Sequence, residues 1–107
     1  MYKRIIEDKI EQYLQGNDYK TFYIWGPRRS GKTTVLRDLA QKLGVRIFNF
    51  DYTTHHTFFA PDRGVLDKLT RDNPIILIDE VQNYPQATVA LKLLYDEYKV
   101  KVVATGS

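Results

Sequence analysis

One segment of the sequence, residues 26–33, has residue types and spacing that could hold phosphate groups. It reads GPRRSGKT and matches the pattern G-x-x-x-x-G-K-[ST] without a mismatch. Its two glycines allow the backbone to wrap with N–H groups directed inward, and a helix that begins after the loop would add partial positive charge. The pattern therefore predicts a cradle for the polyphosphate of a nucleotide, rather than a basic turn that happens to contain glycines.

Individual positions of this loop have different expected roles. Lys32 would reach the β- and γ-phosphates, and the hydroxyl of Thr33 would ligate Mg²⁺. Thr34 lies in the first helical turn and could add a phosphate contact, whereas Pro27 has no N–H to donate and should stiffen the shoulder of the loop. The expected nucleotide-binding residues are Gly26, Pro27, Arg28, Arg29, Ser30, Gly31, Lys32, Thr33 and Thr34.

Arg28 and Arg29 fit three roles, namely contact with the nucleotide, contact with a neighbouring subunit, or exposure to solvent. Together with Lys32 they account for the whole net charge of +3, since 3 − 3 = 0. A protein that binds nucleic acid needs a broader basic patch. The sequence therefore gives no support for DNA or RNA binding by this segment.

A second segment, residues 75–80, joins an apolar run to two acids. The run IILI contains no polar residue, as expected for a parallel strand covered on both faces, and Asp79 and Glu80 follow it. Asp79 is expected to hold Mg²⁺ directly or through water. Glu80 could accept a proton from an attacking water or orient that water. The alternative is that the two acids only cap the next segment.

A third segment, residues 102–107, reads VVATGS. Thr105 and Ser107 would leave a strand near the γ-phosphate, where a hydroxyl could hold the attacking water or sense the phosphate. The alternative is an ordinary polar turn. Asp51, which follows another expected strand, could lie near the nucleotide or cap that strand.

The elements that must position these residues follow from the spacing of apolar residues. Helices are expected at 1–16, from the glycine loop to 43, around 65–69 and at 86–98, and strands at 21–25, 45–50, 75–79 and 100–107. Residues 52–64 are expected to form a mobile loop. The alternation of helices and strands predicts right-handed crossovers and a three-layer α/β sandwich with a parallel sheet. In such a sheet, ligands bind where the strands end.

Length and composition narrow the classes further. A chain of 107 residues can form one small domain, and the absence of Cys excludes disulfides and thiolate metal sites. His55 and His56 are set aside as zinc ligands, because adjacent side chains in an extended loop diverge. The aromatic residues lie mostly in expected strands and helix stripes, so we expect core packing. No membrane-spanning run or signal peptide is evident, which points to the cytoplasm.

The three segments in this order resemble the AAA+ branch of the P-loop ATPases, and more narrowly the prokaryotic AAA-type ATPases that carry a C-terminal domain of unknown function. The resemblance spans nearly the whole chain. It implies that residues 26–34 are Walker A, that Asp79 and Glu80 are Walker B, and that Ser107 or Thr105 is sensor 1. It also implies ATP and Mg²⁺ as cofactors. The implied catalytic residues are Lys32, Glu80, Ser107 and Thr105, and the implied metal ligands are Thr33 and Asp79.

The resemblance implies a strand order of 5-1-4-3-2, of which only strands 1 to 4 are present, and an edge at 21–25 that is apolar and unpaired. Such proteins also have a fifth strand, an arginine finger and a helical lid after sensor 1. We therefore expect residues 1–107 to be part of a longer ATPase with a C-terminal partner domain, and a homo-oligomer would be compatible with this. Arg63 and Arg71 precede Walker B and are poor finger candidates, so this part alone should bind nucleotide better than it hydrolyses it.

Three functions fit these residues. The leading one is a module that hydrolyses ATP to drive or switch a partner domain. The second is a nucleotide-binding switch in signalling or DNA-associated regulation, in which occupancy rather than turnover carries the signal. The third is a small-molecule kinase, although Glu80 directly after Asp79 favours water as the phosphate acceptor.

Overall fold

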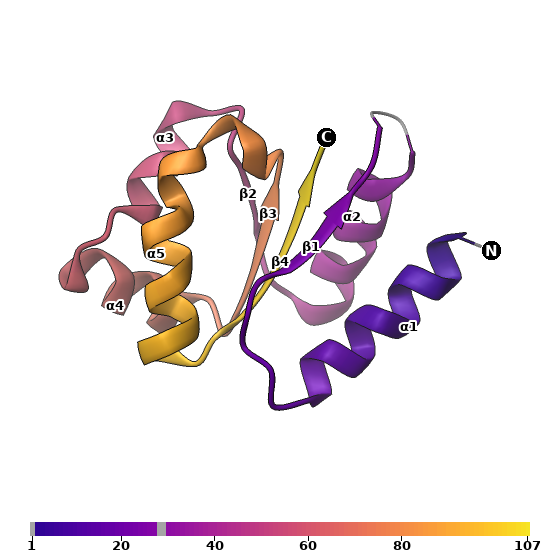
Figure 1. The fold of residues 1–107 in the computed structure, drawn as a ribbon, viewed down its shortest axis with the longest axis horizontal. Coiled ribbons are helices and arrows are strands. Elements are labelled where there is room, and N and C mark those ends of the chain that lie inside the picture. The colour runs from indigo at the N-terminus through magenta and orange to yellow at the C-terminus, as the bar shows by residue number, and fades with distance from the viewer. Residues whose placement is uncertain (1, 28–29) are drawn as a thin grey trace.

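A four-stranded parallel sheet forms the centre of the molecule (Figure 1). The computed structural model describes residues 2–27 and 30–107. The strands lie in the order β1-β4-β3-β2, and every neighbouring pair is parallel. This confirms the expected α/β fold and the 1-4-3-2 part of the expected strand order. The strands are β1 (Phe22–Trp25), β2 (Ile47–Asn49), β3 (Ile75–Asp79) and β4 (Lys101–Gly106).

Helices cover both faces of the sheet. Helices α1 and α2 lie on one face, and α3, α4 and α5 lie on the other (Figure 1). A π-helical turn at Leu94–Tyr98 continues α5 toward β4. The helices are α1 (Tyr2–Gln15), α2 (Lys32–Leu43), α3 (Thr53–His56), α4 (Arg63–Asp72) and α5 (Thr88–Leu93).

The central strands β3 and β4 bury side chains on both faces, which explains their uninterrupted apolar sequences. Leu77 and Val103 belong to the core under α1 and α2. Ile76, Ile78 and Val102 belong to the core under α4 and α5, and all five side chains are almost completely inaccessible to solvent. Alternate residues of a strand point to opposite faces, so only a sheet covered on both sides can bury such a run.

Helix α1 is fixed to the sheet by apolar and polar contacts. Ile10 and Tyr13 are buried against the sheet, and the Tyr13 hydroxyl accepts a hydrogen bond of 3.0 Å from the Val102 main-chain N–H. Burial raises the pKa of Tyr13 to about 12, so this hydroxyl stays neutral at physiological pH.

A buried lysine at the start of β4 holds the connection between α1 and β1. The Lys101 ammonium donates to the carbonyl oxygens of Gly16, at 2.8 Å, and of Asp18. It also lies over the rings of Tyr13 and Tyr19, 4.5 and 4.4 Å from their centroids. Carbonyl oxygens and aromatic faces therefore replace the water that this charge loses on burial.

The expectation of a loop at 52–64 was wrong. Residues Thr53–His56 form α3, and Thr57–Phe59 form a 3-10 turn. The ring of Phe59 is fully buried. Its centroid lies 5.2 Å from the ring centroid of Phe48 and 5.1 Å from that of Phe50. Burial of this aromatic cluster offsets the entropy lost on ordering the segment, a tertiary effect that local sequence does not show.

Both histidines of this segment bond to the main chain around the end of β2. His55 Nδ1 accepts from the Asn49 N–H at 2.9 Å, and His56 Nε2 bonds to the Phe50 carbonyl oxygen at 2.8 Å. His55 Nδ1 and His56 Nε2 are therefore both engaged by the main chain. These two hydrogen bonds fix residues 53–56 to the end of β2.

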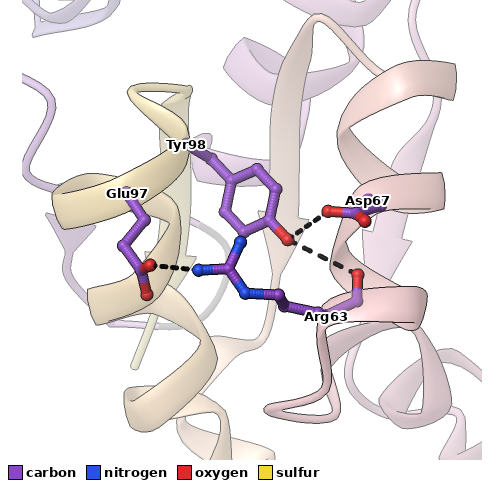
Figure 2. Close-up of polar contacts among 4 residues, drawn as sticks. All are labelled: Arg63, Asp67, Glu97 and Tyr98. Atoms are coloured by element: carbon purple, nitrogen blue, oxygen red, sulfur yellow. Dashed lines mark hydrogen bonds and ion pairs between the residues drawn. The ribbon is translucent and has the colours of Figure 1, made fainter.

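A polar cluster joins α4 to the turn that follows α5 (Figure 2). Arg63 pairs with Glu97 at 2.7 Å, and the Tyr98 hydroxyl donates to the Asp67 carboxylate. The Arg63 side chain is 76% exposed, so solvent screens the pair and its contribution to stability is small. Its guanidinium is engaged within this cluster.

We predict that Lys101→Met destabilises the fold by about 1–3 kcal/mol, because it removes the charged donor that bonds to the carbonyl oxygens of Gly16 and Asp18. The free energy of unfolding in urea measures this. Lys92→Met is the matched control, because Lys92 is exposed on α5. Equal stabilities for the two variants would contradict the role of Lys101.

A second prediction concerns acid stability. Burial, with Arg46 and His56 nearby, lowers the pKa of His55 below 6.5 in the folded state. As pH falls below about 6.5, His55 becomes protonated in the unfolded chain but stays neutral in the folded state. The free energy of unfolding should therefore decline until the pH passes the lowered pKa of the folded state. His55→Gln should flatten this decline between pH 7.5 and 5.5 in thermal denaturation. His56→Gln retains His55 and should keep the decline; identical slopes in both variants would refute the assignment.

Candidate functional site

A pocket of about 480 Å³ lies at the carboxyl ends of the strands, where α2 begins. The glycine loop, β2, β3 and the residue after β4 all contribute to it. Among the described residues it thus brings together the three segments selected from the sequence. The lining residues are Gly31, Lys32, Thr33, Thr34, Arg37, Asn49, Asp51, Asp79, Glu80 and Ser107.

The glycine loop is anchored at both ends. The Gly26 N–H donates to the Gly106 carbonyl oxygen at 3.2 Å, which ties the loop to β4. At the other end Gly31 has φ +90°, a left-handed conformation that side chains disfavour, and α2 starts at the next residue. Strand β1 ends at Trp25 and α2 begins at Lys32. Arg28 and Arg29 lie outside the described residues.

The Lys32 side chain lies within the loop that precedes it. Its ammonium donates to the carbonyl oxygens of Gly26 and, at 2.6 Å, Pro27, and it lies 3.3 Å from the Ser30 hydroxyl. The residue is only 6% exposed. Within the described part of the chain, the partners of this buried cation beside the pocket are neutral oxygen atoms, which a phosphate oxygen could replace.

The carboxylate of Asp79 connects β3 to its neighbours. Oδ2 accepts from the Thr33 hydroxyl at 3.3 Å, and Oδ1 accepts from the Thr105 hydroxyl at 2.5 Å and from the Glu80 N–H at 3.0 Å. Asp79 is 7% exposed and forms no ion pair within residues 2–27 and 30–107. A buried carboxylate beside a hydroxyl, without a protein cation, is an oxygen donor set that fits Mg²⁺.

Glu80 has a backbone conformation that is unusual for a residue with a side chain. Its φ of 56° and ψ of 48° are left-handed, and a 3-10 turn at Val81–Asn83 follows. Such conformations are costly and occur often at functional sites. The Glu80 side chain makes no capping bond to the turn, which leaves its carboxylate available to the pocket.

The two hydroxyls selected near the end of the chain have different surroundings. Thr105 is fully buried and its hydroxyl is directed at Asp79. Ser107 is exposed, lines the pocket, and donates its N–H to Gln82 Oε1 at 3.3 Å. Of these two residues, Ser107 lines the pocket and Thr105 does not.

Gly106, which lies between these two residues, has an aromatic ring beside it, so a side chain at this position would have to displace that ring. A Cβ added at Gly106 would lie 2.2 Å from the ring of Trp25. Trp25 is 55% exposed on the edge strand β1 and stacks on Tyr23, with 5.3 Å between ring centroids. These two rings therefore depart from the expected core packing of aromatic residues.

The sequence reasoning missed Arg37 and Asn49, both of which line the pocket. Asn49 ends β2 directly beside Asp79 in the strand register. Arg37 lies one helical turn after Thr33. The sequence offered one signal for each residue. Asn49 is a polar residue at the end of an expected strand, and Arg37 lies on the second turn of the helix that follows the glycine loop. Asp51, for which the sequence allows a place near the nucleotide or a role as strand cap, lines the pocket and accepts a hydrogen bond from the Asn83 side chain.

Comparison with known proteins agrees with this geometry. The model of a family described as an AAA domain matches residues 18–107. An uncharacterized protein of Methanocaldococcus jannaschii is 25% identical over 116 residues, which cover 96% of this chain and 24% of that protein. The chain thus spans about a quarter of the curated relative. No described helix has the length and apolarity to cross a bilayer. The parallel sheet, the glycine loop and the family match together show that this chain belongs to the AAA domain family of P-loop proteins.

Proposed function

We propose that this chain binds Mg²⁺–ATP and forms part of an ATPase domain that drives or switches a partner domain. The single observation that carries the proposal is the buried ammonium of Lys32, set where a central strand turns into a helix, next to the Thr33–Asp79 pair. AAA domains generally bind and hydrolyse nucleotides, and this arrangement supports that activity here. The greater length of the curated relative supports a domain beyond residues 1–107.

Binding would use residues that already line the pocket. The Lys32 ammonium would exchange the carbonyl oxygens of Gly26 and Pro27 for oxygens of the β- and γ-phosphates, a stronger charge-assisted contact. Thr33 and Asp79 would hold Mg²⁺, which neutralises charge on the phosphates when it is bound. The start of α2 adds its partial positive charge.

Hydrolysis would use Glu80 as the base. A water oxygen forms a bond to the γ-phosphorus, the bond from that phosphorus to the bridging oxygen of ADP breaks, and the water proton passes to the Glu80 carboxylate. Ser107 lines the pocket and could hold this water, while Thr105 keeps Asp79 in place. These roles make Glu80 and Ser107 the catalytic candidates, and Thr105 a positioning residue.

Substitution of Lys32 tests the binding site. Lys32→Ala should weaken the affinity for Mg²⁺–ATP at least about tenfold, because a charge-assisted bond worth roughly 1.5–3 kcal/mol is lost. Calorimetry measures the affinity, and emission from Trp25, the only tryptophan, offers a second readout beside the loop. Lys42→Ala, at an exposed position in the last turn of α2, is the control. Unchanged affinity in Lys32→Ala would end the proposal.

Substitution of Glu80 separates hydrolysis from binding. Glu80→Gln should preserve the dissociation constant for Mg²⁺–ATP and lower kcat in the full-length protein by about 10²–10⁴-fold, since the amide cannot accept the water proton. Phosphate release and calorimetry give the two quantities. Glu97→Gln, on the π-helical turn after α5, is the matched control. If Glu80→Gln keeps full turnover, Glu80 is not the base and another group must accept the proton of the attacking water.

A further inference from the structure

The turn that follows the acidic pair is bonded to two strand ends around the pocket. We call residues 80–84 the 80–84 turn. On one side, Asn83 Nδ2 donates to Asp51 Oδ1, two residues beyond the end of β2. On the other side, Gln82 Oε1 accepts from the Ser107 N–H at 3.3 Å, next to the end of β4. The turn therefore bridges the strands that flank β3.

An aromatic contact reinforces the bond to the β2 side. The ring of Tyr84 stacks on that of His56, with centroids 4.0 Å apart and planes inclined by 9°. Tyr84 also meets the edge of Phe50 at 5.5 Å. His56 itself bonds to the Phe50 carbonyl oxygen. The end of the 80–84 turn thus rests on a surface built by the residues after β2.

The conformation of Glu80 depends on this turn. Glu80 is left-handed, which is intrinsically unfavourable by about 1–2 kcal/mol for a residue with a side chain. Its side chain makes no capping hydrogen bond to the turn. Its carbonyl oxygen accepts from the Asn83 N–H at 3.0 Å. Asn83 therefore closes the turn on Glu80 with its main chain and joins the turn to Asp51 with its side chain.

We infer that Asp51 and Asn83 are positioning residues that hold the Glu80 carboxylate at the site of attack. The inference rests on the proposed role of Glu80 as the base, and it assigns to Asp51 a function through Asn83 rather than through contact with the nucleotide. Both side chains are exposed, so their hydrogen bond adds little to global stability. Its effect should appear in catalysis, where small displacements of a catalytic group cost large factors.

A reciprocal exchange of the two side chains tests this in the full-length protein. Asn83→Asp places two carboxylates against each other and should lower kcat about tenfold or more, with KM for Mg²⁺–ATP within about twofold of the parent. Asp51→Asn retains an oxygen acceptor for the Asn83 amide, so its loss of kcat should be smaller than that of Asn83→Asp. The double variant Asp51→Asn/Asn83→Asp restores an amide–carboxylate pair with the donor reversed, and its kcat should recover.

Thermal melting of each variant provides the control for folding, and we expect melting temperatures within a few degrees of the parent. Should Asn83→Asp fold poorly, Asn83→Ala and Asp51→Ala form a second cycle, in which both losses of kcat should be equal and not additive. A purely structural role would change the melting temperature together with kcat, whereas a positioning role should change kcat and leave the melting temperature near that of the parent.

Three results would overturn the inference. The first is an unchanged kcat in Asn83→Asp. The second is a double variant no more active than Asn83→Asp. The third is a loss confined to KM in Asp51→Asn, which would place Asp51 on the nucleotide itself. Glu80→Gln is measured in parallel: if it abolishes turnover while the exchange has no effect, only the positioning role fails. If it keeps turnover, the proposed base and this inference fail together.

Discussion

The candidate site depends on the hydrogen bonds that the buried carboxylate of Asp79 accepts. Its two oxygens accept hydroxyl hydrogen bonds from Thr33 at the start of α2 and Thr105 in β4, so one side chain joins three elements. A carboxylate removed from water is costly unless hydrogen bonds or a cation compensate it. Hydroxyls compensate it only in part, and this leaves a place for a divalent cation that would also meet a phosphate.

This arrangement requires β4 to lie between β1 and β3. The insertion brings the last residues of the sequence next to the glycine loop, through the Gly26–Gly106 bond, and next to the acidic pair, through Thr105. Parallel strands share the direction of their carboxyl ends, so each polar residue that follows a strand joins the same edge. The pocket is therefore a consequence of topology, and its chemistry comes from the residues that the strands deliver.

The charges in the site are arranged so that binding would replace one set of partners with another. Lys32 has only neutral oxygen partners among the described residues, and Asp79 has only hydroxyl and N–H donors. Neither charge is neutralised by the other. Each remains able to attract its own counterpart, an anion at Lys32 and a cation at Asp79, and a magnesium–polyphosphate offers both in one ligand.

The sequence by itself determined the parts that local interactions control. The pattern at residues 26–33 indicated the loop because its glycines and Lys32 act within a few residues of one another. The apolar run before Asp79 indicated a strand covered on both faces because alternate side chains face opposite directions. Helix and strand periodicity then gave the sandwich and the edge at which the site lies.

The tertiary structure alone decided the contacts between distant segments. The helical form of 53–59, the burial of Thr105 against Asp79 and the bond between Asp51 and Asn83 all join residues that are far apart in the sequence or depend on such residues for burial. Their side chains are compatible with several local conformations, and only the strand register and packing select one. The sequence could therefore name the chemistry, while through-space contacts decided which residues support it.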